Sequence, residues 1–289
     1  MAEDPFLTHR GLLFTVAYEM LGSAADAEDV LQEAWLRWDD VDQSEVRDPR
    51  AYLVRVVTRQ ALNQMRTLSR RREDYVGEWL PEPLLTSPDV AEDIELAESV
   101  SMAMLTVLET LGPTERAVFV LREVFDVPYG DIADAIEKSP DTVRQIARRA
   151  RDHVAERRPR MRVSRSEQEA VVERFLVAMR TGQVQALMEV LAPDVILIAD
   201  GGGLVPAIRV PVHGPDRVAR LLARAHDAPV TLEPSPVWLN GAPAVRVEFD
   251  GELGAAVSLV LEESRITRIY IVRNPHKLGH LDEPAQLAR

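Results

Sequence analysis

The sequence predicts a multidomain protein in which two all-helical domains are followed by an α+β domain. Residues 6–70 and 93–158 carry apolar residues at helical spacing without strand alternation. Alternating apolar segments typical of strands begin only after residue 190, behind two further helical segments. A proline-containing acidic stretch and an arginine-rich stretch separate these three parts. A chain of 289 residues is also too long for one ordinary small domain.

Composition argues against several classes of protein. The chain has no cysteine, so it has no disulfide framework and no thiolate metal site. The first residues, MAEDPFLTHR, do not form a signal peptide, and no apolar run reaches the roughly 18–20 residues of a membrane span. The histidines lack metal-ligand spacing, and no catalytic triad or phosphate-binding loop is found. We therefore expect a cytoplasmic protein with no membrane contact, catalytic residue, metal or cofactor.

Charge is distributed unevenly along a chain whose formal net charge is −13. Residues 47–72 hold eight arginines and one acid, residues 78–98 hold seven acids and no base, and residues 141–162 hold eight arginines and three acids. The net charge argues against nucleic-acid binding by the whole surface. Two basic segments joined by an acidic one instead predict local contacts with nucleic acid.

Residues 128–154 have the pattern of a helix-turn-helix. Ser139 is the expected N-cap of the second helix, with Pro140 in its first turn. In this motif the second helix enters the major groove of DNA, where arginine and glutamine contact phosphates and base edges. The candidate contacts are Thr142, Arg144, Gln145, Arg148, Arg149 and Arg151. The alternative is an arginine-rich surface helix without a DNA partner.

A second basic helix is predicted at 49–73, preceded by an acidic helix at 26–38. The basic helix offers Arg55, Arg59, Asn63, Gln64 and Arg66 to nucleic acid, opposite an apolar stripe. The acidic helix combines carboxylates with tryptophans, which suits a basic protein partner more than DNA. Its candidate contacts are Asp26, Asp29, Val30, Gln32, Glu33 and Trp35. The alternative is an ordinary helix with a charged face and buried tryptophans.

The segment between the helical domains is unusually apolar for a tether. It contains the sequence WLPEPL, that is, Trp79, Leu80, Pro81, Glu82, Pro83 and Leu84. A flexible linker would be polar. We expect this segment to pack on the C-terminal domain or on a protein partner, or else to lie as a strap across the first helical domain.

From residue 167 the pattern predicts an α+β domain. Helices are expected at 169–180, 184–191 and 214–225, and strands at 195–200, 208–214, 244–251, 255–262 and 267–273. Asn240-Gly241 and Asp250-Gly251 are typical of tight turns between strands. The glycines of DGGG permit a sharp bend after the first strand. We expect Asp200 to cap that turn rather than to act as an acid in a pocket.

Three of these stretches together resemble the extracytoplasmic-function (ECF) group of bacterial sigma factors. DAEDVLQEAWLRW is similar to the helix that binds core RNA polymerase, and RAYLVRVVTRQALNQMR to the helix that contacts the minus-ten element. LGPTERAVFVLREVFDVPYGDIADAIEKSPDTVRQIARRAR is similar to the domain that reads the minus-thirty-five element. The resemblance covers roughly residues 6–160. Family members commonly have asparagine and aspartate where this chain has Arg59 and Asn63. They usually have glycine where this chain has Glu137, so we expect a looser or differently shaped turn here.

The resemblance implies an alternative sigma factor, which directs core RNA polymerase to promoter DNA and is not an enzyme. The helix at 26–38 would dock on the polymerase clamp. Residues 39–50 and the following helix would capture an unpaired minus-ten base, and the second basic helix would hold duplex DNA upstream. Two weak sites on one polymerase then act together through a high effective concentration.

Residues 167–289 resemble SnoaL-like domains, cone-shaped α+β folds with an apolar pocket between a bent sheet and helices. WLPEPL together with DGGG and NPHKL resembles the ECF subgroup that carries this extension, which usually has aspartate at His276. The DGGG motif consists of Asp200, Gly201, Gly202 and Gly203, and the NPHKL motif of Asn274, Pro275, His276, Lys277 and Leu278. The extension is implied to regulate sigma activity in cis, with no separate anti-sigma factor. Lys277 is expected to reach the linker. The motifs leave open whether the pocket binds a small molecule.

The predicted division is 1–76 for sigma region 2, 77–98 for the acidic linker, 99–160 for sigma region 4 and 161–289 for the regulatory domain. Two alternatives remain: a ligand-sensing helix-turn-helix repressor, and a SnoaL-like enzyme with a DNA-binding appendage whose activity depends on Asp200. The helix at 26–38 favours the sigma factor, because neither alternative needs a polymerase-docking surface. No motif indicates the promoter sequence, the inducing signal, the direction of regulation or the oligomeric state.

Overall fold

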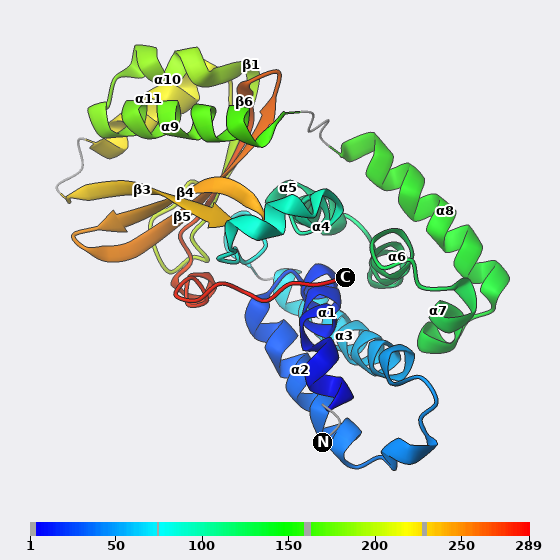
Figure 1. The fold of residues 1–289 in the computed structure, drawn as a ribbon. Coiled ribbons are helices and arrows are strands. Elements are labelled where there is room, and N and C mark those ends of the chain that lie inside the picture. Colours follow the sequence, from blue (N-terminus) through cyan, green and yellow to red (C-terminus); the bar gives the residue numbers. More distant parts are fainter. Residues whose placement is uncertain (1–3, 74, 159–162, 227–229) are drawn as a thin grey trace.

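The structure, a computed structural model, describes residues 4–73, 75–158, 163–226 and 230–289. It confirms the predicted fold class of two helical domains and an α+β domain (Figure 1). The side chains of Arg70, Arg71 and Arg72, as well as Arg160, Arg162 and the predicted boundary at 160–161, lie outside the described residues. In the described part of the chain, no helix is long and apolar enough to cross a membrane.

Among the described residues, the helical part contains eight α-helices in two groups. The first group is α1 (Pro5–Leu21), α2 (Ala24–Asp39) and α3 (Pro49–Glu73), with a short 3-10 helix at Gln43–Glu45. The second group is α4 (Ile94–Ser99), α5 (Met102–Leu108), α6 (Pro113–Phe119), α7 (Tyr129–Ile136) and α8 (Pro140–Arg157), with a π-helical turn at Val120–Val124. Both groups contribute to one continuous apolar core. The C-terminal half of the predicted linker 77–98 is helical, because it contains a 3-10 helix at Pro88–Glu92 and most of α4.

The predicted cap at Ser139 is confirmed, and Ser23 provides a further cap that was not predicted. Ser23 and Ser139 accept a hydrogen bond from the backbone N–H of the third residue of α2 and α8, respectively. Glu137 ends α7 in the left-handed conformation (φ 55°, ψ 49°) that glycine would adopt at this place. The turn therefore forms despite the glutamate, at a cost of about 1–2 kcal/mol for the strained backbone.

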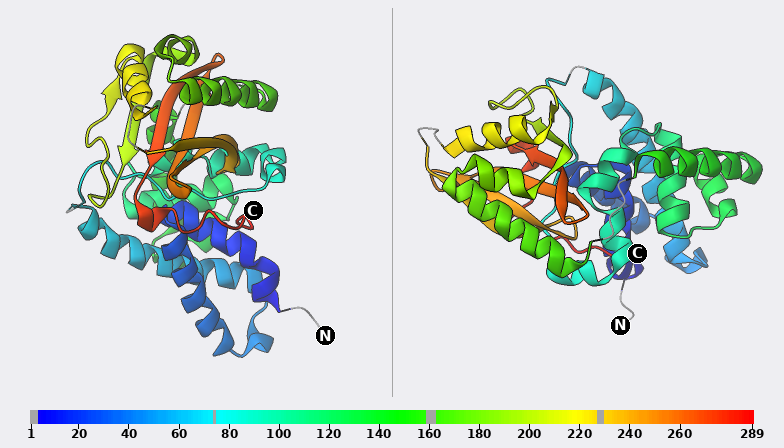
Figure 2. Two further views of the ribbon diagram at one scale, coloured as in Figure 1. Left: turned by 90° about the vertical axis from the view of Figure 1, so that its left-hand side faces the viewer. Right: turned by 90° about the horizontal axis from the view of Figure 1, so that it is seen from above.

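In the part of the C-terminal domain that the structure describes, three helices pack on a six-stranded sheet. The helices are α9 (Arg165–Thr181), α10 (Val184–Val190) and α11 (Pro215–His226); the strands are β1 (Leu191–Asp200), β2 (Val212–His213), β3 (Leu232–Leu239), β4 (Ala242–Phe249), β5 (Glu252–Glu262) and β6 (Arg265–Val272). The strand order is β2-β1-β6-β5-β4-β3, and only the β1–β6 pair within this order is parallel. Two views show the helices gathered on one face of a strongly bent sheet (Figure 2).

Two strand predictions need correction. The segment 232–239 forms β3, for which no strand was predicted. Pro234 and Pro236 lack a donor for the hydrogen-bond ladder, and they are tolerated because β3 lies at the sheet edge. The strand predicted at 208–214 shortens to the two residues of β2. The turns at Asn240-Gly241 and Asp250-Gly251 are confirmed, with positive φ at all four residues.

The opposite face of the sheet is covered by the segment between the helical groups. Leu80, Met102 and Tyr270 belong to one apolar cluster there, together with Leu281 from the C-terminal segment. That segment then runs back along α1, where the backbone N–H of Ala288 donates to Thr15 Oγ1 at 3.1 Å (Figures 1 and 2). The α+β domain is thus packed against the helical part through apolar side chains and the C-terminus.

Candidate functional site

The second helix of the helix-turn-helix, α8, presents a basic face to solvent. Of its predicted DNA contacts, Arg144, Gln145, Arg148, Arg149 and Arg151 are exposed and Thr142 is half-buried. The opposite face is buried through Val143, Ile146, Ala147, Ala150 and Val154. Salt bridges hold Arg144 to Asp141 at 2.5 Å and Arg151 to Glu123 at 3.7 Å. These exposed pairs are weak enough for phosphates to replace the carboxylates.

The predicted minus-ten face of α3 is only partly open. Asn63 and Arg66 are exposed, Arg55 is half-buried beside Tyr52, and the Nε2 of Gln64 donates to Asp26 Oδ1 at 2.9 Å. Arg59 reaches α7, where its guanidinium donates to the carbonyl oxygens of Asp134 and Ala135. In this conformation one of the predicted base-contacting side chains is therefore bound to the helix-turn-helix.

The predicted protein-binding face of α2 requires one correction. Val30 is 4% exposed and belongs to the helical core, so it supports α2 rather than offering a contact to a partner. Asp29, Gln32, Glu33 and Trp35 are exposed, and Asp26 is half-buried in its bond to α3. Leu36, which was not predicted, adds a large exposed apolar side chain beside Trp35. An acidic rim around exposed apolar area remains on this face.

The WLPEPL segment docks on the first helical group through its glutamate. Glu82 is 1% exposed, and its Oε2 accepts hydrogen bonds from Ser23 Oγ at 3.1 Å and from the backbone N–H of Ala24 at 2.8 Å. The carboxylate thus caps the N-terminus of α2, where the helix dipole favours negative charge. The Tyr18 hydroxyl donates to the Glu82 carbonyl oxygen at 2.6 Å, and His280 Nδ1 lies 2.7 Å from Glu82 Oε1.

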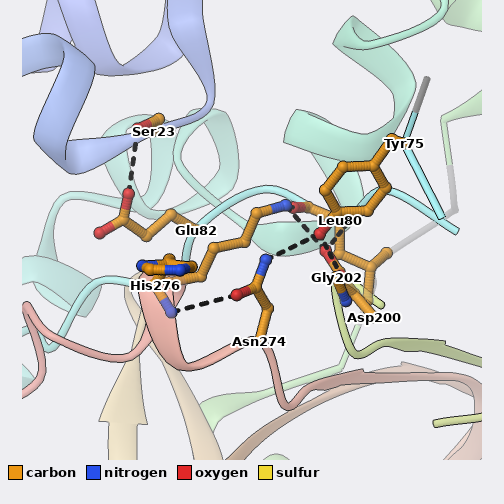
Figure 3. A network of polar contacts seen from close by, with 9 residues as sticks. Ser23, Tyr75, Leu80, Glu82, Asp200, Gly202, Asn274 and His276 are labelled. Atoms are coloured by element: carbon orange, nitrogen blue, oxygen red, sulfur yellow. Dashed lines mark hydrogen bonds and ion pairs between the residues drawn. The ribbon is translucent and has the colours of Figure 1, made fainter. Parts of the chain in front are cut away.

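The same segment docks on the α+β domain through a buried polar cluster, which we call the interdomain network: Tyr75, Leu80, Asp200, Asn274 and Lys277 (Figure 3). Asp200 is completely buried, and its carboxylate accepts bonds from the Tyr75 hydroxyl at 2.5 Å and the Leu80 N–H at 3.0 Å. Lys277 Nζ lies 2.7 Å from Asp200 Oδ2 and donates to the Leu80 carbonyl oxygen at 2.6 Å. The predicted contact between Lys277 and the linker is confirmed.

The surroundings of the interdomain network favour this arrangement electrostatically. The ammonium group of Lys277 lies 3.2 Å from the centre of the Trp79 ring, a cation–π contact. Burial, followed by the bond to Asp200, raises the pKa of the Tyr75 hydroxyl, so this group stays a neutral donor. Asp200 also accepts the backbone N–H of Gly202 at 2.9 Å. Asp200 therefore caps the DGGG turn, as predicted, and in addition holds the linker.

Several residues of this interface were missed by the sequence analysis. Tyr75 precedes the WLPEPL motif and carried no signal of its own. Asn240 was recognised only as a turn residue, yet its amide donates to Tyr18 Oη at 2.7 Å and to the Val100 carbonyl oxygen at 2.9 Å. Its Oδ1 accepts the backbone N–H of Leu84 at 3.0 Å. The turn between β3 and β4 therefore touches both helical groups and the linker.

Comparisons with known proteins agree with this architecture. The family models for Sigma-70 region 2 and Sigma-70, region 4 match residues 6–71 and 101–154. The chain is 39% identical over 228 residues to the ECF RNA polymerase sigma factor SigJ of Mycobacterium tuberculosis, covering 77% of this chain and 72% of that protein. It is 34% identical over 277 residues to the probable ECF RNA polymerase sigma factor SigI of the same species, covering 94% and 93%. The crystal structure of M. tuberculosis SigJ matches with a TM-score of 0.76 at 31% identity, covering 96% of this chain and 98% of that one.

These matches favour the sigma factor over the repressor and the enzyme. Both sigma regions occur in the predicted order, and the similarity to SigJ and SigI extends into the α+β domain. A sigma factor is a transcription initiation factor, whose partners are core RNA polymerase and promoter DNA. The chain belongs to the ECF RNA polymerase sigma factors, as a member with a C-terminal α+β domain of the predicted SnoaL-like type.

Proposed function

We propose that this sigma factor is regulated in cis by its α+β domain, with no separate anti-sigma factor, in the cytoplasm. Residues 1–76 bind polymerase through the exposed part of α2 and the minus-ten element through α3. Residues 99–160 bind the minus-thirty-five element through α8, and residues 161–289 set the relative placement of the two through the linker at 77–98.

The interdomain network is the observation that carries this proposal. The Lys277–Asp200 ion pair is almost fully buried, with 7% and 0% of the side chains exposed. A buried ion pair is costly to form and more costly to break on one side only. The ion pair binds the linker backbone at Leu80, and Glu82 of the same segment caps α2. The linker therefore connects the α+β domain to the polymerase-binding helix.

Transcription with purified core polymerase tests the proposal. A library of genomic fragments serves as template, and 5′-end sequencing of the transcripts reports start-site selection. The full chain is compared with Lys277→Met, with the exposed-charge control Arg220→Met, and with a chain that ends at Ser166. We expect the full chain to confer defined start sites and Lys277→Met to change their yield severalfold, while Arg220→Met does not. Defined start sites with the same yield for every variant would leave the sigma function intact and exclude regulation in cis.

A further inference from the structure

The α+β domain contains an apolar cavity that is separate from the polar groups of the interdomain network. It lies between the concave face of the sheet and helices α9 and α11, with a volume of about 570 Å³. Its wall includes Met179 from α9, Leu222 from α11, Val247 from β4 and Val257 from β5. Cavities of about 300–1,000 Å³ with mostly apolar walls and a few polar groups are typical of small-molecule sites.

One charged side chain, Arg273, stands among the described residues that line this cavity. It continues the alternation of β6, in which Ile269 and Ile271 face the same apolar core. Its Nη1 donates to the Pro206 carbonyl oxygen at 2.6 Å, and its guanidinium carbon lies 4.8 Å from the centre of the Phe249 ring. The guanidinium is thus fixed at the edge of the cavity by a loop and an aromatic ring.

The hydrogen-bonding capacity of Arg273 is not filled by the protein. Its Nε–H is buried and has no acceptor among the residues that the structure describes. A buried donor without an acceptor costs about 1–3 kcal/mol. Desolvation by burial also lowers the pKa of Arg273. The described residues that line the cavity include no carboxylate.

We infer that this cavity binds an apolar carboxylic acid, whose carboxylate pairs with Arg273 and whose hydrocarbon body fills the space between the sheet and α9 and α11. A carboxylate matches the donors of a guanidinium and neutralises its single charge. A phosphate monoester would bring a second charge that no other cation of the described lining compensates. The apolar walls select a hydrocarbon body over a polar one.

The site lies next to the interdomain network along the main chain. The backbone N–H groups of Arg273 and Asn274 both donate to the Asp200 carbonyl oxygen, at 2.7 and 3.0 Å. Ala199, which precedes Asp200, lines the cavity. A ligand is thus one residue away from the group that holds the linker. Any effect of the ligand on transcription rests on the proposed regulation in cis, whereas binding does not.

Calorimetric titration of the purified full chain tests binding without polymerase, with decanoate and decanol as probes that differ in the head group. We expect decanoate to bind at one site per chain. Decanol should bind at least about tenfold more weakly, because it lacks the charge-assisted bond. Arg273→Gln should lower decanoate affinity to that of decanol and leave decanol unchanged. Arg220→Gln, which removes an exposed charge that does not line the cavity, should leave both affinities unchanged.

Other outcomes overturn the inference. They are a lack of saturable binding of either probe, equal affinities of the native chain for the two probes, uptake of several decanoates per chain, or an equal loss in Arg220→Gln. The comparison of the two probes on the native chain remains decisive even if Arg273→Gln folds poorly, which circular dichroism would reveal.

Discussion

Arg59 donates from its Nη2 to the carbonyl oxygen of Asp134 at 2.7 Å, so the predicted minus-ten helix is bound to the first helix of the helix-turn-helix. The two promoter elements lie about 25 base pairs apart, which is about 85 Å of duplex at 3.4 Å per base pair. The 18-residue helix α8 is only about 27 Å long at 1.5 Å per residue. The two proposed DNA-binding surfaces therefore cannot reach both promoter elements at once while this bond is intact.

We expect α3 and α7 to separate when the chain binds polymerase and promoter. The chain has no cysteine, so spin labels at Ala51→Cys and Asp131→Cys report one distance. Both residues are exposed and line the same groove between the helical groups. Electron–electron resonance should show a short distance in the free chain and a much longer one in the promoter complex. Labels at Ala51→Cys and Thr67→Cys, both on α3, are the control; an unchanged Ala51–Asp131 distance in the complex contradicts the opening.

Lys277→Met should destabilise the folded chain by about 3 kcal/mol, because it leaves the buried carboxylate of Asp200 without its cation. Adding Asp200→Asn to this variant should restore part of the loss, since the uncompensated charge is removed. Urea denaturation measures the free energy of unfolding of the native chain and both variants. The control Arg220→Met should stay within about 0.5 kcal/mol. Equal stability of Lys277→Met and the native chain would show that the pair does not hold the domains together.

The parts of this structure that the sequence predicted are local ones. The Ser139 cap, the basic face of α8 and the turn at Asn240-Gly241 depend on residues that are near one another in the chain. The burial of Val30 and the bond of Arg59 to α7 depend on which helices pack together, and no spacing rule encodes that choice. The role of Tyr75 likewise exists only because the linker meets Asp200, 125 residues further along the chain.

Glu19 should make the stability of the helical core depend on pH. Burial raises its pKa from 4.5 to about 8, against the opposing effects of the bond from Ser99 and the charge of Arg116. A raised folded-state pKa means that this contribution to stability is complete below about pH 4.5 and is lost as the pH rises through about 8. Glu19→Gln stays neutral, so it should lose less stability than the native chain between pH 5 and pH 8.5, as measured by denaturation at each pH. The exposed Glu173→Gln should follow the native chain, and identical slopes for all three would contradict the prediction.

Trp35→Ala should weaken binding to core polymerase without unfolding the chain. Trp35 is 41% exposed on the acidic face of α2, and exposed aromatic residues of this kind often dominate an interface. We expect an affinity loss of about tenfold or more, because tryptophan truncation at such a site costs about 2 kcal/mol. Surface plasmon resonance with immobilised core polymerase measures it. Leu7→Ala, which removes an exposed apolar side chain from α1, should have no effect; a similar loss in both variants would place the contact elsewhere.

Arg148→Ala should reduce the salt dependence of promoter binding by the polymerase complex. Arg148 is exposed on the face of α8 opposite the buried Ile146 and Ala147, and we propose that it pairs with a phosphate. Loss of one phosphate contact lowers the magnitude of the slope of log affinity against log salt by about 1 and weakens all promoter sequences alike. Fluorescence anisotropy with labelled promoter duplexes over a series of potassium chloride concentrations gives the slope. Arg217→Ala, an exposed arginine of α11, should keep the native slope. A loss confined to one promoter sequence would instead mean that Arg148 reads a base edge, because only base contacts discriminate between sequences.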